Sequence, residues 1–124
     1  MSAHHNLEIL LHSLTQNNPD LVAAMVVDPS GRVRASEAVA PEVARAAVAL
    51  AVPARDLLDR VCAELGCGAL RSVLIEGDLA TLAFADVDGA TTAVLVGATG
   101  AAAGALRADA LAFVTRLQEG TRAS

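Results

Sequence analysis

The sequence predicts an α/β (α+β) fold: a five-stranded antiparallel sheet with flanking helices, in the order α-β-β-α-β-β-β-α. Three segments repeat their apolar residues at the 3.6-residue period of an amphipathic helix. Five shorter apolar runs are bounded by turn residues, which is typical of strands. Short turns rich in Asp and Gly join successive strand segments, and such turns connect antiparallel neighbours.

A short helix precedes the first two strands. The helix is predicted over His5–Gln16, and its apolar face consists of Leu7, Leu10, Leu11 and Leu14. Leu21–Val27 is uniformly apolar and predicts a buried strand. The turn Asp28-Pro29-Ser30-Gly31 has Asp, Pro and Gly where a type I turn followed by a left-handed residue requires them. Arg32–Ser36 alternates polar and small apolar residues, so it predicts a half-exposed strand near a sheet edge.

The longest helical pattern, Pro41–Leu65, is apolar on two sides. One stripe consists of Val43, Ala47, Leu50, Ala54, Leu57 and Val61, and the other of Ala44, Val48, Ala51, Leu58, Cys62 and Leu65. Such a helix needs two partners, its own sheet and something else. On the polar face we expect the ion pairs Arg55–Asp59 and Asp56–Arg60. Pro53 predicts a kink or a restart, because a proline inside a helix costs about 3 kcal/mol.

Three strands and a helix complete the pattern. Leu70–Glu76 is predicted to pair with Leu79–Ala85 across the turn Gly77-Asp78, and Ala90–Gly97 to return after Asp88-Gly89. Since this last strand is apolar on both faces, we expect it to be central. The last helix is predicted over Ala101–Gln118.

The composition excludes several classes of function. The 124 residues predict a single domain, 1–124, with an ordered core of about 5–119. The net charge is -5, the chain has no lysine, and Phe84 and Phe113 are its only Phe, Tyr or Trp residues. A nucleic-acid partner is therefore not expected, nor is lysine-based chemistry. No signal peptide or membrane insertion is expected, so the two cysteines are read as reduced thiols of a cytoplasmic protein.

No catalytic, cofactor or metal site is predicted. The glycine-rich segment Val94–Gly104 resembles a dinucleotide-binding turn, but too little chain follows it to complete that fold. Cys62 and Cys67 lack the C-x-x-C spacing of a redox motif. His5, Glu8 and His12 share one helical stripe but are too few for a structural zinc site.

Three local signals, in this order, resemble the Roadblock family, which includes dynein light chains and bacterial MglB-like proteins. The first is an apolar strand that ends in V-V-D-P-S-G, Val26–Gly31. The second is an Ala-rich helix that closes with E-L-G-C-G, Glu64–Gly68, before the strand S-V-L-I-E, Ser72–Glu76. The third is the strand A-V-L-V-G, Ala93–Gly97, which leads into G-A-L-R, Gly104–Arg107.

The resemblance implies a non-enzymatic homodimer that binds and regulates a Ras-like small GTPase or serves as a scaffold. In this family the long helices pack antiparallel and edge strands pair. Carried onto this chain, the expected dimer interface consists of Val43, Ala47, Leu50, Ala54, Leu57, Val61, Ser72 and Leu74. The residues expected to position the GTPase are Arg45, Asp56 and Arg60.

Two other functions stay open. A profilin-like or GAF-like sheet could hold an apolar small molecule between sheet and helices, although the scarcity of aromatic residues argues against such a pocket. An enzyme that uses the glycine-rich turn would bind a dinucleotide.

Overall fold

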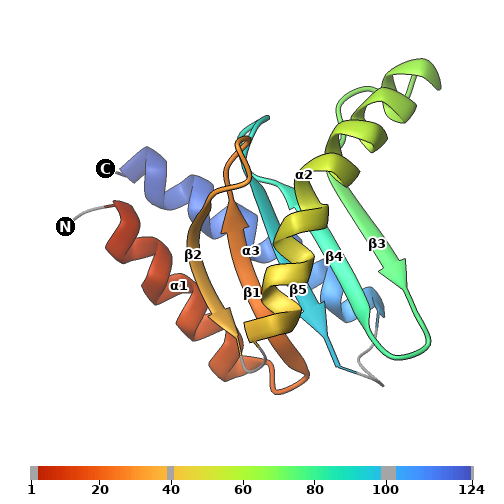
Figure 1. Ribbon diagram of the computed structural model, residues 1–124. Helices are drawn as coiled ribbons and strands as arrows, with labels where there is room; N and C mark the ends of the chain where they lie inside the picture. The colour runs from red at the N-terminus through yellow and green to blue at the C-terminus, as the bar shows by residue number, and fades with distance from the viewer. Residues whose placement is uncertain (1–2, 39–40, 99–102, 124) are drawn as a thin grey trace.

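The computed structural model describes residues 3–38, 41–98 and 103–123, and it contains the eight elements in the predicted order (Figure 1). Their bounds are α1 Ala3–Asn17, β1 Leu21–Val27, β2 Val33–Ala38, α2 Pro41–Glu64, β3 Ser72–Glu76, β4 Thr81–Asp86, β5 Thr92–Gly97 and α3 Ala103–Ala123. The last helix therefore continues past Gln118, where the sequence pattern ended it. Within these residues, no helix combines the length and the apolar character that crossing a bilayer requires.

All five strands form one antiparallel sheet in the order β2-β1-β5-β4-β3. The predicted central strand, β5, lies in the middle, and every residue of it is buried. The half-exposed strand β2 forms one edge, as predicted, and β3 forms the other. Uniformly apolar strands thus occupy the middle of the sheet, because only there are both faces covered.

Helices cover both faces of the sheet. Figure 1 shows α2 on one face and α1 with α3 on the other. Alternate strand residues supply the two cores, since successive side chains point to opposite faces. Beneath α1 and α3 lie Ala24, Val26, Ala83, Ala85 and Leu95. Beneath α2 lie Ala23, Met25, Val27, Phe84, Val94 and Val96.

The predicted turn between β1 and β2 is confirmed. The backbone N–H of Gly31 donates to the carbonyl of Asp28 at 3.0 Å, and Gly31 has a φ of 89°. The Asp28 carboxylate accepts hydrogen bonds from the backbone N–H groups of Ser30 and Arg32 and from the Ser30 hydroxyl. These bonds lower the pKa of Asp28, and the contact with the Ser30 hydroxyl contributes most.

The two other hairpin turns are longer than predicted. Glu76 pairs with Thr81, so four residues connect β3 to β4 instead of Gly77-Asp78 alone. Asp86 pairs with Thr92, so five residues connect β4 to β5. A two-residue type I′ turn needs a positive φ at both central residues. No non-glycine residue in the described ranges has one, which rules out that turn at either place.

Helix α2 runs through Pro53 without a restart. Proline has no N–H to donate to the carbonyl four residues earlier, which is a common cause of a bend. Figure 1 shows the axis of α2 changing direction about half-way along, in keeping with the predicted kink.

A glycine cap closes the C-terminus of α2. Gly66 has a φ of 71°, its N–H donates to the carbonyl of Ala63, and the N–H of Cys67 donates to the carbonyl of Cys62. This pair of bonds is the Schellman arrangement, in which a left-handed residue lets the chain close on the last free carbonyls of a helix.

Candidate protein interface

The inner face of α2 is built for close packing on the sheet. Ala47 and Ala51 are buried there, and their small side chains bring the helix near Met25 and Val94. Half-buried Ala44, Val48, Val52 and Ala54 complete this contact. Ala47, expected at the dimer interface, therefore belongs to the chain's own core. Ala54, also expected at that interface, packs against the same core.

The outer face of α2 exposes large apolar side chains. The exposed fractions are 36% for Val43, 63% for Leu50, 60% for Leu57, 39% for Val61 and 72% for Leu65. Single exposed hydrophobic residues are ordinary, but these recur at helical spacing on one side of one helix. Such an aligned set marks an interaction surface. We call these five residues the outer face of α2.

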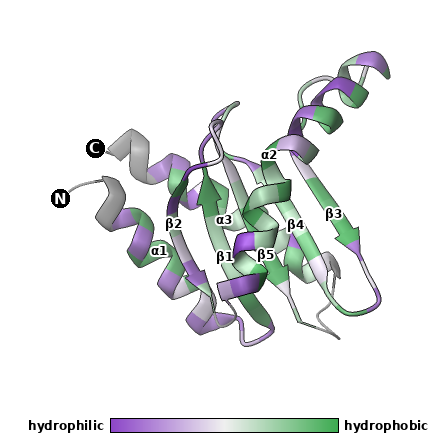
Figure 2. Ribbon diagram, in the orientation of Figure 1, coloured by the Kyte–Doolittle hydropathy of each residue, from purple (hydrophilic) through white to green (hydrophobic). Residues whose placement is uncertain are grey.

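The C-terminal half of α2 extends beyond the sheet (Figure 1). Arg55 is the last buried residue of the helix, and every later residue up to Glu64 is half-buried or exposed. Figure 2 shows hydrophobic residues interspersed with hydrophilic ones along this projecting half. The sheet does not cover this projecting end of the helix. Packing against a second surface would therefore stabilise it and bury its apolar residues.

The edge strand β3 provides a second place for contact. It pairs only with β4, so its other backbone edge is free of any strand in the described chain. Leu74 packs toward the core beneath α1 and α3, whereas Val73 belongs to the core beneath α2. Ser72 and Leu74 thus lie on the sheet face away from α2, and β3 would contribute to pairing through its backbone.

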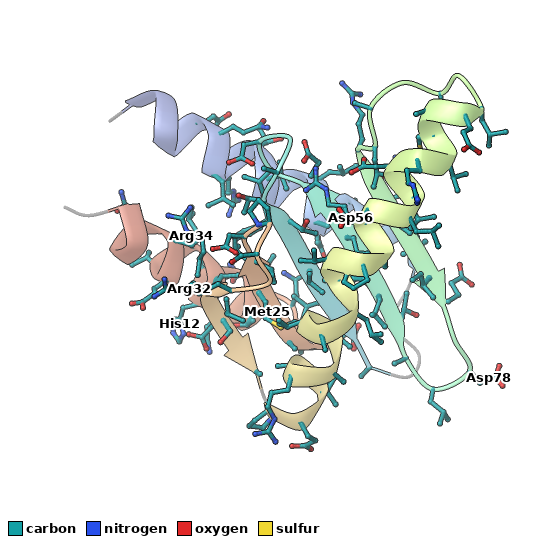
Figure 3. The ribbon with its side chains drawn as sticks, turned by 45° about the horizontal axis from the view of Figure 1, so that its top comes forward. His12, Met25, Arg32, Arg34, Asp56 and Asp78 are labelled. Atoms are coloured by element: carbon teal, nitrogen blue, oxygen red, sulfur yellow. The ribbon has the colours of Figure 1, made fainter. Side chains whose placement is uncertain are left out.

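The three predicted partner-binding residues are all exposed on α2: Arg45, Asp56 and Arg60. Figure 3 labels Asp56 on this helix. The expected Asp56–Arg60 ion pair is not formed, whereas Arg55–Asp59 is, with 3.5 Å between Arg55 Nε and Asp59 Oδ2. Apolar residues flanked by free charges form the usual pattern of a contact core with a polar rim.

Sequence reasoning missed the main role of Arg55, which is buried at 7% exposure. Its Nη1 donates to the carbonyl of Thr91 and to Oγ1 of Thr92, both at 2.9 Å, and its Nη2 contacts the Asp86 carboxylate. Asp86 in turn accepts the backbone N–H of Gly89 at 2.9 Å. This cluster fastens α2 to the β4–β5 hairpin at the point where the helix leaves the sheet. One feature of the sequence could have indicated this role. Arg55 follows Ala51 by four residues, so it lies on the same side of the helix as Ala51, which faces the sheet.

Asp88 caps the same hairpin. Its carboxylate accepts the backbone N–H groups of Ala90 at 3.1 Å and Thr91 at 2.8 Å. These bonds, above all the one from Thr91, lower the pKa of Asp88. Asp88 and Asp86 therefore both stabilise this hairpin, and Asp86 is also the partner of Arg55.

A groove of about 670 Å³ lies between β2 and the N-terminal half of α2. Its lining is mostly apolar and consists of Met25, Val33, Ser36, Glu37, Ala38, Pro41, Ala44, Arg45, Val48 and Ala49. In Figure 3, Met25 lies beneath α2. None of the lining residues is aromatic, so the groove lacks the flat rings that commonly line pockets for small molecules.

The other motifs are described only in part. Cys62 is half-buried, Cys67 is exposed, and both are free thiols. No group of three or more His, Cys, Asp or Glu side chains that could hold a metal ion occurs in the described part of the chain. The side chain of His5 and residues 99–102 of the glycine-rich turn lie outside the described residues.

No protein-family model matches the chain, and no curated protein matches it in sequence. Solved structures do match. The Roadblock/LC7 domain from Streptomyces avermitilis is 22% identical, with a TM-score of 0.80, and the match covers 93% of this chain and 97% of that one. Myxococcus xanthus MglB is 13% identical, with a TM-score of 0.85, over 97% of this chain and 90% of that one. An MglB with a tetrameric arrangement is 15% identical, with a TM-score of 0.83, over 94% of this chain and 88% of that one.

These similarities establish the fold. The chain has a Roadblock-like fold, as the order of sequence signals predicted.

Proposed function

We propose that this Roadblock-like chain is a single-domain, cytoplasmic and non-catalytic homodimer that binds a Ras-like small GTPase and modulates its nucleotide cycle or acts as its scaffold. The observation that carries the proposal is the outer face of α2, where four residues of the sequence-predicted interface are exposed: Val43, Leu50, Leu57 and Val61. The similarity to an MglB with a tetrameric arrangement supports assembly into oligomers.

In the proposed dimer, two copies of α2 pack against each other and the free edges of two β3 strands pair. The apolar outer face is removed from water, and such burial contributes about 25 cal/mol per Å². A stable interface buries about 800 Å² per partner, which one long helix and one edge strand can supply. Pairing also covers an open strand edge, which natural proteins usually protect.

The GTPase would dock on the polar rim of α2, with Arg45, Asp56 and Arg60 as the contact residues. All three are exposed, and they form no ion pair within the described residues. A partner can therefore bind them without breaking an ion pair inside the chain. Charged residues at a rim act mainly on the rate and specificity of association.

Light scattering coupled to size exclusion tests the dimer. The wild-type chain is expected at twice the 12.6 kDa of one chain, and the double variant Leu50→Glu/Leu57→Glu at that monomer mass. Ile9→Glu is the matched control, because Ile9 is 50% exposed on α1, on the other side of the sheet. A monomeric wild-type chain, or a dimeric double variant, contradicts the dimer.

A binding assay tests the GTPase separately. Ras-like GTPases of the same genome, each loaded with GDP or a non-hydrolysable GTP analogue, are titrated against the wild-type chain and against Asp56→Lys/Arg60→Glu. We expect one nucleotide state of one GTPase to bind, and the variant to bind about tenfold more weakly while remaining dimeric. Arg116→Glu on α3 is the charge control. No binding by any GTPase contradicts this part of the proposal and leaves the dimer standing.

The alternative of a small-molecule sensor has less support. The groove beside β2 is mostly apolar, yet its lining is free of aromatic rings.

A further inference from the structure

The groove between β2 and the N-terminal half of α2 lies directly beside a free strand edge. Among the described residues, strand β2 is the outermost strand on its side of the sheet and pairs only with β1. In an antiparallel pair, alternate residues of an edge strand direct their N–H and C=O groups away from the neighbour. Val33, Ser36 and Ala38 of this same strand line the groove. One ligand could therefore use both the backbone edge and the apolar hollow.

The edge is regular over most of its length. The register shift between Val26 and Val27 places Arg34 in a bulge near the start of β2, whereas Ala35–Ala38 pairs regularly with β1. A bulge commonly protects an edge from other chains, but only where it lies. The regular stretch remains open to an added strand.

Three arginines lie near this edge. Figure 3 shows Arg32, Arg34 and His12 on the same side of the molecule, beyond the outer edge of β2. Arg45 lines the groove from α2. Two acids lie nearby: Glu37 lines the groove, 3.6 Å from Nδ1 of His12, and the Asp28 carboxylate binds its own turn. In a chain of net charge -5, this edge is a local basic site.

From these observations we propose that the β2 edge and its groove bind an extended acidic peptide segment of a partner protein. The segment adds a strand to β2, its apolar side chains on one face enter the groove above Met25, and its acidic side chains meet Arg34 and Arg45. Backbone pairing supplies affinity in this mode of binding, and alternate side chains supply specificity. A helical segment satisfies its own backbone groups, so it would not use the free edge.

The site is separate from the proposed dimer. No residue of the outer face of α2 lines the groove, and β2 and β3 are opposite edges of the sheet. The peptide site therefore stands or falls independently of dimer formation.

Two displayed peptide libraries test the site. Each peptide has about nine residues, enough to span the six residues of β2. Apolar residues alternate with Asp or Glu in one library and with Lys or Arg in the other. Peptides enriched on the purified chain are synthesised, labelled and titrated by fluorescence anisotropy, and amide exchange of the chain is measured with and without them.

We expect the acidic library alone to be enriched, with dissociation constants of about 1 to 100 µM. Bound peptide should protect amides of Ala35–Ala38 from exchange. Val33→Asp, an exposed groove residue, and Arg34→Glu should each weaken binding about tenfold. Ile9→Asp and Arg116→Glu, exposed residues outside the groove, should leave binding unchanged.

Four results would overturn the proposal. They are no enrichment over the Val33→Asp chain, equal enrichment of basic peptides, binding that both groove variants leave unaltered, and protection that falls on β3 or on the outer face of α2 instead of β2.

Discussion

A single buried arginine determines how α2 leaves the sheet. Arg55 holds the Asp86 carboxylate, a backbone carbonyl and a threonine hydroxyl together at the end of the β4–β5 hairpin. A charge at 7% exposure is tolerated because each side of the guanidinium meets an acceptor. No buried side-chain nitrogen or oxygen among the described residues lacks a hydrogen-bond partner.

Arg55→Ala is expected to lower the free energy of unfolding by about 3 kcal/mol, because the Asp86 carboxylate loses its cationic partner. Urea denaturation followed by circular dichroism measures the change. Arg60→Ala, an exposed arginine on the same helix, should cost less than about 0.5 kcal/mol. Equal losses for the two variants would show that the Arg55 cluster adds nothing to stability.

The hairpin carboxylates make stability depend on acid pH. The folded-state pKa values of Asp28 and Asp88 lie below their ordinary value of 3.8, because both carboxylates accept hydrogen bonds, above all from the Ser30 hydroxyl for Asp28 and from the Thr91 N–H for Asp88. Carboxylates whose pKa is lower in the folded state bind fewer protons there than in the unfolded state at a pH near 3.8. Their contribution is thus complete well above pH 3.8 and is lost as the pH falls through the folded-state values.

Asp88→Asn should make the acid-side loss of stability shallower, since an amide oxygen can keep the turn hydrogen bonds but does not titrate. Thermal unfolding between about pH 2 and pH 7 measures the slope. Asp78→Asn, an exposed aspartate in the β3–β4 connection, is the control. An unchanged slope for Asp88→Asn would contradict the assignment.

At the scale of the element, α2 depends on how it is interrupted and how it ends. Pro53 bends the helix without ending it, so the first half lies on the sheet and the second half projects from it (Figure 1). Gly66 then closes the helix in a left-handed conformation. An added Cβ at Gly66 would meet nothing within 4 Å, so any cost of a side chain there comes from the backbone alone.

Gly66→Ala should lower the free energy of unfolding by about 1 kcal/mol, because a positive φ is strained for any residue with a Cβ. Gly104→Ala in α3 is a matched control, as its Cβ also meets nothing within 4 Å and its φ is not positive. That control should be neutral or stabilising by up to about 1 kcal/mol. Denaturant unfolding of the two variants measures both changes in the free energy of unfolding. A loss of stability for Gly104→Ala as large as that for Gly66→Ala would refute the argument.

At the scale of the whole molecule, the apolar surface exceeds what one copy covers. The outer face of α2 is exposed in both halves of the helix, with Leu50 at 63% and Leu57 at 60%. If a second copy covers this face in solution, folding and association are linked.

The thermal unfolding midpoint of the wild-type chain should therefore rise with protein concentration, by a few degrees per about tenfold increase. The midpoint of Leu50→Glu/Leu57→Glu should stay constant over the same range. Scanning fluorimetry with an external dye, read across the concentration series, gives both curves. A constant wild-type midpoint would show that folding does not depend on association.

Much of the fold was predictable, since local patterns encode it. The central place of β5 follows from an uninterrupted apolar run, and the edge position of β2 follows from its alternation. The Asp28–Gly31 turn follows from residue types whose backbone preferences are intrinsic. The connections after β3 and β4 were predicted too short, because a dipeptide signal does not show where the backbone bond from Gly77 to Ala80 or the side-chain bonds of Asp86 and Asp88 close a turn. The two-sided character of α2 was also predictable, but Ala47 was assigned to the wrong side of the helix.

By itself, the sequence determined the number, order and type of the elements, which strand is central, and the presence of an apolar surface too large for one sheet face to cover. These properties depend on periodicity and turn chemistry within a few residues. Only the tertiary structure decided which stripe of α2 faces the sheet, that Arg55 meets Asp86 31 residues further along the chain, and that a groove opens beside β2. Such contacts join residues that are remote in sequence, so they depend on how the packed layers fit together and not on any local pattern.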